Sequence, residues 1–162
     1  MADRRAILIS MHTIATASFS IQPFEKTHSI TPHVNGASLV EMVSAFEREQ
    51  GFDPIGGYGG LVPGYFKYGS LDKYFLGEFE PNSYFSNWGK VYLLGCSCGE
   101  VGCWPLTAHI ATEGDSVEWA AFGQDHRPER DYSAFGPFVF AADQYRQAVA
   151  ALLDEFSVLV KD

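Results

Sequence analysis

The sequence lacks the features that would place the protein with nucleic acids or in a membrane. It has 11 Lys and Arg against 20 Asp and Glu, a formal net charge of −9, and no basic run. This excess of negative charge repels nucleic acid and anionic membrane surfaces, so neither is an expected partner. No apolar run approaches the roughly 18 residues that a membrane-spanning helix needs. A basic protein is the partner class that the charge favours.

Cysteine is scarce, and its placement favours a reducing compartment. The chain has 3 cysteines, all within positions 96–103, whereas a secreted disulfide-stabilised domain spreads an even number along its length. The N-terminus resembles a signal peptide only superficially, because Ser10, His12 and Thr13 interrupt its apolar stretch. We therefore expect a cytoplasmic protein.

Recognised nucleotide-binding motifs are also missing. The glycine-rich segment 51–64 is not followed by Gly-Lys-Ser/Thr, and it has no strand before it and helix after it, so it fits neither a phosphate loop nor a dinucleotide turn. The aromatic-rich segment that follows, from Tyr58 to Trp88, is interpreted as core. A stacking platform for a sugar or a base is the alternative, in a ligand-binding module.

The length, composition and local patterns of the sequence indicate one α+β domain spanning residues 1–162. The length suits a single domain, and 46% hydrophobic with 19% charged residues is typical of a globular chain. We expect an antiparallel sheet, made of an N-terminal strand pair and a C-terminal three-stranded meander, packed by two helices. The predicted strands are residues 6–12, 17–24, 91–98, 104–112 and 117–122, with a short edge strand at 135–140.

Both helices carry local signals. Ser38 and Glu41 form a capping box before an apolar stripe of Leu39, Val43 and Phe46, and Gly51 is placed to end this helix. The second helix begins at about residue 143, and one face of it carries Tyr145, Val149, Leu152 and Phe156. The polar segment 25–36 is not assigned.

The most informative segment, Gly95–Leu106, contains all three cysteines. Side chains alternate along a strand, so Cys96 and Cys98 are expected on one face. A four-residue turn at 99–102 would place Cys98 opposite Cys103. Since thiolates that converge in this way can hold zinc, the segment predicts a structural zinc site.

A zinc ion usually needs a fourth ligand, and the expected strand register indicates His126. If residues 113–116 form a hairpin turn, residue 126 falls beside Cys103. His109 lies on the same strand as Cys103 but about 20 Å away, which is too far, and His12 is a weaker substitute for His126. Two other interpretations stay open for the cysteines: buried core thiols, and a redox or nucleophilic role.

A nucleophilic role of the cysteines would make the protein a Cys/His-dependent enzyme, which is the alternative function. Cys103 or Cys98 would be the nucleophile, His126 the base and Glu100 the orienting group. No catalytic motif supports it, so a non-enzymatic binding protein is the leading expectation. The loop 124–132 is predicted as a contact surface through its charged residues, Asp125, Arg127, Glu129 and Arg130.

The C-terminal half also resembles a family of small bacterial proteins of unassigned function. The resemblance rests on Leu93–Leu106, on Trp119, on the pair His126-Arg127 and on the segment Phe135–Phe138. It implies a bacterial cytosolic protein. It implies no activity, cofactor or site residue.

Overall fold

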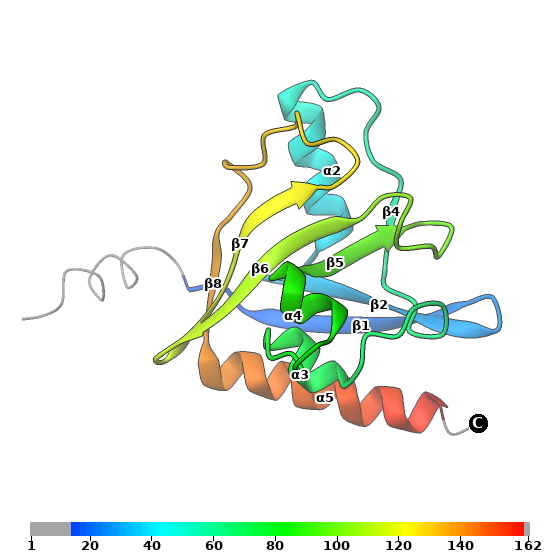
Figure 1. The fold of residues 1–162 in the computed structure, drawn as a ribbon, viewed down its shortest axis with the longest axis vertical. Helices are drawn as coiled ribbons and strands as arrows, with labels where there is room; N and C mark the ends of the chain where they lie inside the picture. The colour runs from blue at the N-terminus through cyan, green and yellow to red at the C-terminus, as the bar shows by residue number, and fades with distance from the viewer. Residues whose placement is uncertain (1–13, 161–162) are drawn as a thin grey trace, which may run out of the picture.

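The computed structural model describes residues 14–160, which form two antiparallel sheets and flanking helices (Figure 1). The first sheet has the strand order β1-β2-β3, and the second has the order β4-β5-β6-β7-β8. Main-chain pairing joins the two sheets at Ile30 with Leu61, and at Ala15 with Phe140. The α+β class is therefore confirmed, with two curled sheets in place of the single sheet that was expected.

The first sheet contains a strand that the sequence did not reveal. β1 is Ala17–Phe24, as predicted, but it pairs with β2 (Thr27–Val34), which lies in the unassigned segment; β3 is only Ala37–Ser38. β2 was missed because it mixes polar with apolar residues. Its Thr31 hydroxyl donates to the side-chain oxygen of Gln22, so this polar group is buried with a partner. The predicted strand 6–12 lies outside the described residues.

The second sheet extends the predicted meander at both edges. The meander consists of β5 (Val91–Cys96), β6 (Leu106–Glu113) and β7 (Ser116–Gln124). At one edge, β8 (Phe138–Ala141) is the predicted short strand and pairs with β7. At the other edge, β4 (Tyr58–Gly59) comes from the glycine-rich segment and pairs with β5. β5 ends two residues earlier than predicted and β6 begins two residues later. The cysteine segment is therefore a loop between two strands.

The hairpin register of β6 and β7 is confirmed over most of its length. Glu113 lies opposite Ser116, and the same register continues to His109 opposite Ala120. A bulge then offsets the pairing by one residue, so that Leu106 lies opposite Gln124. Ala121 has a φ of 55°, which is the local distortion that a bulge requires.

α2 (Leu39–Gln50) begins after Ser38 and ends at Gly51, as predicted, although Ser38 caps the amide of Val40 and not that of Glu41; α5 (Ala142–Val160) begins one residue before its predicted start. The Ser38 hydroxyl accepts from the Val40 amide, and Gly51 ends the helix with a φ of 73°. α5 lies along β1, while α2 covers the other end of the sheets (Figure 1). Two short helices, α3 (Leu71–Phe75) and α4 (Tyr84–Trp88), were not predicted.

The core is mainly aromatic. Trp119 on β7 is fully buried, packs against Phe140, and donates its indole N–H to the Tyr145 hydroxyl of α5. Most rings of the aromatic-rich segment also lie inside the protein, whereas Tyr65 and Tyr84 are exposed. The core interpretation of that segment is therefore largely confirmed. Within the described residues, no helix combines the length and apolar character needed to cross a membrane.

Candidate metal site

The three cysteines lie where β5 turns away from the sheet. Cys96 is the last residue of β5 and lies opposite Tyr58 of β4. Residues 97–105, which we call the cysteine loop, then connect β5 to β6 and carry Cys98 and Cys103. The amide of Ser97 donates to the carbonyl of Gly57 at 2.8 Å, so β4 supports the start of the loop.

A tight turn brings Cys98 back over Cys96. The amide of Gly99 donates to the Cys96 carbonyl at 2.9 Å, and the amide of Cys98 lies 3.4 Å from the Cys96 sulfur. Gly99 has a φ of 99°, a conformation that favours glycine. Amide donors directed at sulfur stabilise a thiolate, and they orient it as a ligand.

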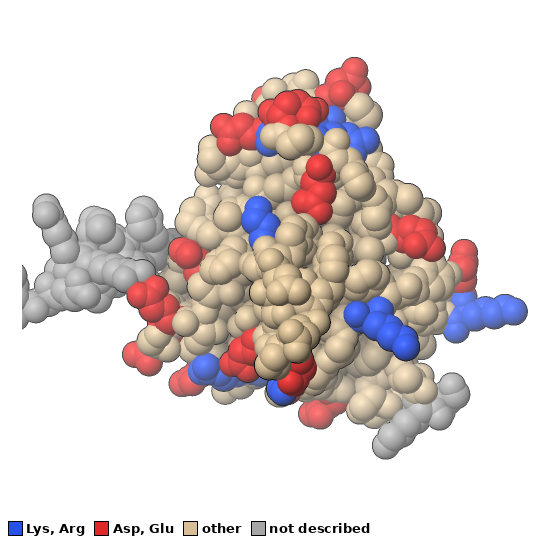
Figure 2. All heavy atoms as spheres, viewed as in Figure 1, with Lys and Arg blue, Asp and Glu red and all other residues tan. Residues whose placement is uncertain are grey.

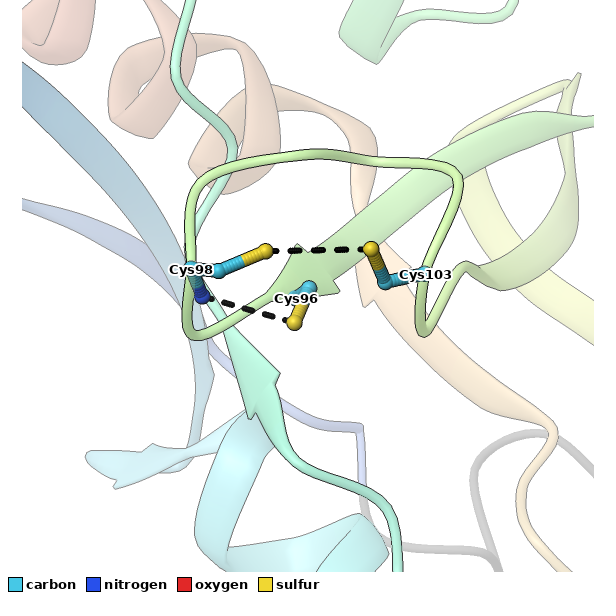
Figure 3. Close-up of side chains that lie close together, drawn as sticks. All are labelled: Cys96, Cys98 and Cys103. Carbon is cyan, nitrogen blue, oxygen red and sulfur yellow. Dashed lines mark hydrogen bonds between the residues drawn. The ribbon is translucent and has the colours of Figure 1, made fainter.

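The three sulfurs converge to the spacing of a metal site. Their Sγ atoms all lie within 4.8 Å of one another, and those of Cys98 and Cys103 are 3.7 Å apart. In Figure 3 the Cys98 and Cys103 sulfurs point toward each other across the loop, with Cys96 beside them at the end of β5. Two sulfurs bound at about 2.3 Å to a tetrahedral zinc ion are about 3.8 Å apart. The three thiols could therefore hold a metal such as zinc, and the Cys98–Cys103 spacing matches that of two zinc ligands.

Two of the thiols face solvent. Cys96 is half-buried, whereas Cys98 and Cys103 are exposed, and all three are free. The interpretation of the cysteines as buried core thiols is therefore wrong for Cys98 and Cys103. The predicted convergence is confirmed, although it arises from a turn after Cys96 and not from two side chains on one face of a strand.

The neighbouring thiols differ in acidity. A backbone hydrogen bond from Glu100, together with the Cys96 side chain, lowers the pKa of Cys98. The hydrogen bond with Cys98, followed by desolvation, raises the pKa of Cys103 to about 11. Cys98 is therefore the first of this pair to become a thiolate as the pH rises.

His126 lies next to the cysteine loop but is not in the sulfur cluster. Its Nε2 atom forms a hydrogen bond with the carbonyl oxygen of Gly102, the residue before Cys103. Among residues 14–160, the ligand atoms that gather at this site are the three sulfurs alone. His12, the weaker candidate for the fourth ligand, lies outside the described residues. His109 is exposed on β6, and Glu100 reaches the cluster through its backbone while its side chain is exposed.

The loop that carries His126 is anchored by two arginines. The Arg127 guanidinium lies 3.5 Å from the centre of the Trp104 ring. Arg130 donates to the Pro54 carbonyl, and its side chain is only 6% exposed. Asp125 and Glu129 are exposed, so they are the two predicted contact residues that lie at the surface, whereas Arg130 faces the interior.

A buried carboxylate that is linked to the site through β4 was missed by sequence reasoning. Glu47 of α2 is fully buried and accepts hydrogen bonds from the Gly56 amide and from the hydroxyls of Tyr58 and Tyr132. Arg130 lies 3.6 Å from it. These bonds fix the chain next to β4, which in turn supports Cys96. The only sequence signal was a glutamate beside the apolar stripe of α2.

Comparisons with known proteins add nothing to this geometry. No protein-family model, curated protein or solved structure matches the chain. The resemblance to a small bacterial family therefore stays a prediction.

Proposed function

We propose that the protein is a metal-binding protein whose three cysteine thiolates hold zinc. The observation that carries the proposal is the 3.7 Å separation of the Cys98 and Cys103 sulfurs, with Cys96 in the same cluster. Soft thiolate ligands select zinc and copper(I) over magnesium or calcium. Zinc at this place would tie β5 to the start of β6 and stabilise the loop between them.

The role that suits such a centre is that of a binding protein. The net charge of −9 supports a basic protein partner. The face seen in Figure 2 carries both acidic and basic side chains, scattered over a mostly uncharged surface, so the support comes from the overall charge and not from one acidic patch. The exposed side chains of Asp125 and Glu129 would add negative charge to such a contact.

One observation favours an enzyme as the second candidate. Cys98 is exposed and its pKa is lowered, as a nucleophile requires. The pKa of Cys103 is shifted in the opposite direction, so Cys98 is the better candidate of the two. In this enzyme His126 would act as base and Glu100 as the orienting group. The hydrogen bond from His126 to the Gly102 carbonyl would have to break first.

The metal content of the purified protein tests the leading proposal. We expect about one zinc per chain in untagged protein prepared without chelator, measured by elemental mass spectrometry. The double variant C98S/C103S should lose the metal because it removes two of three thiolates. The variant H109A should keep it, because His109 is an exposed histidine outside the cluster.

The result that would contradict the proposal is metal-free protein that is folded and has three reduced thiols. Zinc retained in full by C98S/C103S would also contradict it, because the metal would then be bound elsewhere. Circular dichroism of each variant checks that it is folded.

A further inference from the structure

We infer that the metal held by Cys96, Cys98 and Cys103 keeps an open fourth position, which takes a neutral nitrogen donor from outside the chain. The inference rests on the proposed metal site and extends it from a structural centre to a ligand-binding one. A zinc ion with three protein ligands and an exchangeable fourth is the arrangement of reactive zinc sites, whereas structural sites are closed by four.

Within the described residues, the cluster has one ligand fewer than a closed zinc site needs. The three sulfurs supply three ligand atoms, and no carboxylate or imidazole of residues 14–160 joins them within 4.8 Å. The side of the site that carries Cys98 and Cys103 is exposed. A fourth ligand can therefore approach from solvent without any rearrangement of the core.

Among residues 14–160, His126 is the histidine that lies next to the cysteine loop, but its hydrogen bond keeps it out of the cluster. A carbonyl oxygen only accepts hydrogen bonds, so the His126 Nε2 atom must carry the proton in its bond with Gly102. A protonated ring nitrogen has no lone pair for a metal. To serve as a ligand through Nε2, His126 would have to give up this bond and the anchorage that it provides to the loop.

The charge of the site selects the class of donor. Three thiolates and a divalent ion together carry a charge of about −1. An anionic fourth ligand would increase this negative charge in a protein whose net charge is already −9. A neutral donor avoids that repulsion, and imidazole is a nitrogen ligand that suits zinc. Water is the expected occupant in the absence of such a donor.

Cobalt(II) substitution tests the inference, because its visible spectrum reports the ligands. The wild-type chain and H126A would be loaded with cobalt and titrated with imidazole. We expect a saturable change in the ligand-field bands of both proteins with the same midpoint concentration. The thiolate-to-cobalt charge-transfer band should keep its intensity, because the three sulfurs stay bound. Azide, an anionic donor, should bind more weakly than imidazole.

Each other outcome overturns the inference in a recognisable way. If H126A responds and the wild type does not, His126 closes the site and the proposed metal centre survives as a structural one. If neither responds, another group fills the position. Loss of the charge-transfer band would mean that imidazole removes the metal. Tighter binding of azide than of imidazole would show that the site does not prefer a neutral donor. If the wild type binds no cobalt, the proposed function fails, and the inference fails with it.

Discussion

At the scale of single residues, two neighbouring thiols in one loop have different chemistry. Cys98 and Cys103 are both exposed, and their sulfurs are 3.7 Å apart. What separates them is backbone geometry, because a hydrogen bond from Glu100 favours the thiolate of Cys98. The hydrogen bond with Cys98, then desolvation, then the negative charge on Cys98 all raise the pKa of Cys103. A metal would displace the protons of both.

The first prediction at this scale concerns alkylation of the metal-free, reduced protein. Cys98 should react with iodoacetamide faster than Cys103 near neutral pH, because a lowered pKa gives more thiolate at a given pH. As the pH is raised toward about 11, the pKa of Cys103, its rate should increase and the difference should shrink. Peptide mass spectrometry of quenched samples measures both rates. Equal alkylation rates of the two cysteines at neutral pH, or faster reaction at Cys103, would contradict this prediction.

At the scale of elements, the cysteine loop depends on one glycine in a left-handed conformation. A Cβ atom on Gly99 would lie 2.6 Å from a ring atom of Tyr65 and 2.8 Å from one of Phe24. At the other end of the turn, a Cβ atom on Gly102 would meet no atom within 4 Å, and the φ of this residue is not positive. Two glycines in the same loop therefore differ sharply in what they tolerate.

We predict that Gly99→Ala lowers the free energy of unfolding by about 1–3 kcal/mol, from backbone strain and ring clashes together. It should also weaken zinc binding, since the turn that sets Cys98 over Cys96 is disturbed. Gly102→Ala is the matched control and should stay within about 0.5 kcal/mol of wild type. Urea denaturation and competitive zinc titration measure the two effects. Similar losses in both variants would contradict the assignment.

At the scale of the whole molecule, the site depends on a polar network that joins distant parts of the chain. Glu47 of α2 binds the Gly56 amide before β4 and the Tyr132 hydroxyl beyond β7. Arg130 is buried with it, at 3.6 Å. The network holds β4 in place, and β4 pairs with the end of β5 at Cys96. Stability and site geometry are thereby coupled.

Glu47→Ala is therefore expected to cost about 3–5 kcal/mol of unfolding free energy, because it leaves Arg130 as a buried charge without its counterion. Two tyrosine hydroxyls would also lose their acceptor. Glu49→Ala, two residues along the same helix but exposed, should change stability by no more than about 0.5 kcal/mol. Guanidinium denaturation of both variants provides the comparison. A cost below about 1 kcal/mol for Glu47→Ala would show that the network is dispensable.

The sequence by itself determined the features whose causes lie within a few residues. The α2 cap at Ser38 and its end at Gly51 follow from local hydrogen bonding and backbone preference. The β6–β7 turn follows from short-range alternation around a glycine, and the convergence of the cysteines from their spacing in a short loop.

Only the tertiary structure decided the features that depend on distant partners. The polar strand β2 exists because β1 pairs with it along its whole length. The buried position of Glu47 depends on three donors from two other segments of the chain. The exposure of Cys98 and Cys103 depends on where β5 leaves the sheet. The bulge near Ala121 moved the register by one residue, and the strand pairing ends at Leu106 and Gln124, before it reaches His126. Local patterns report on local conformation, whereas burial and ligand geometry are set by which segments fold against each other.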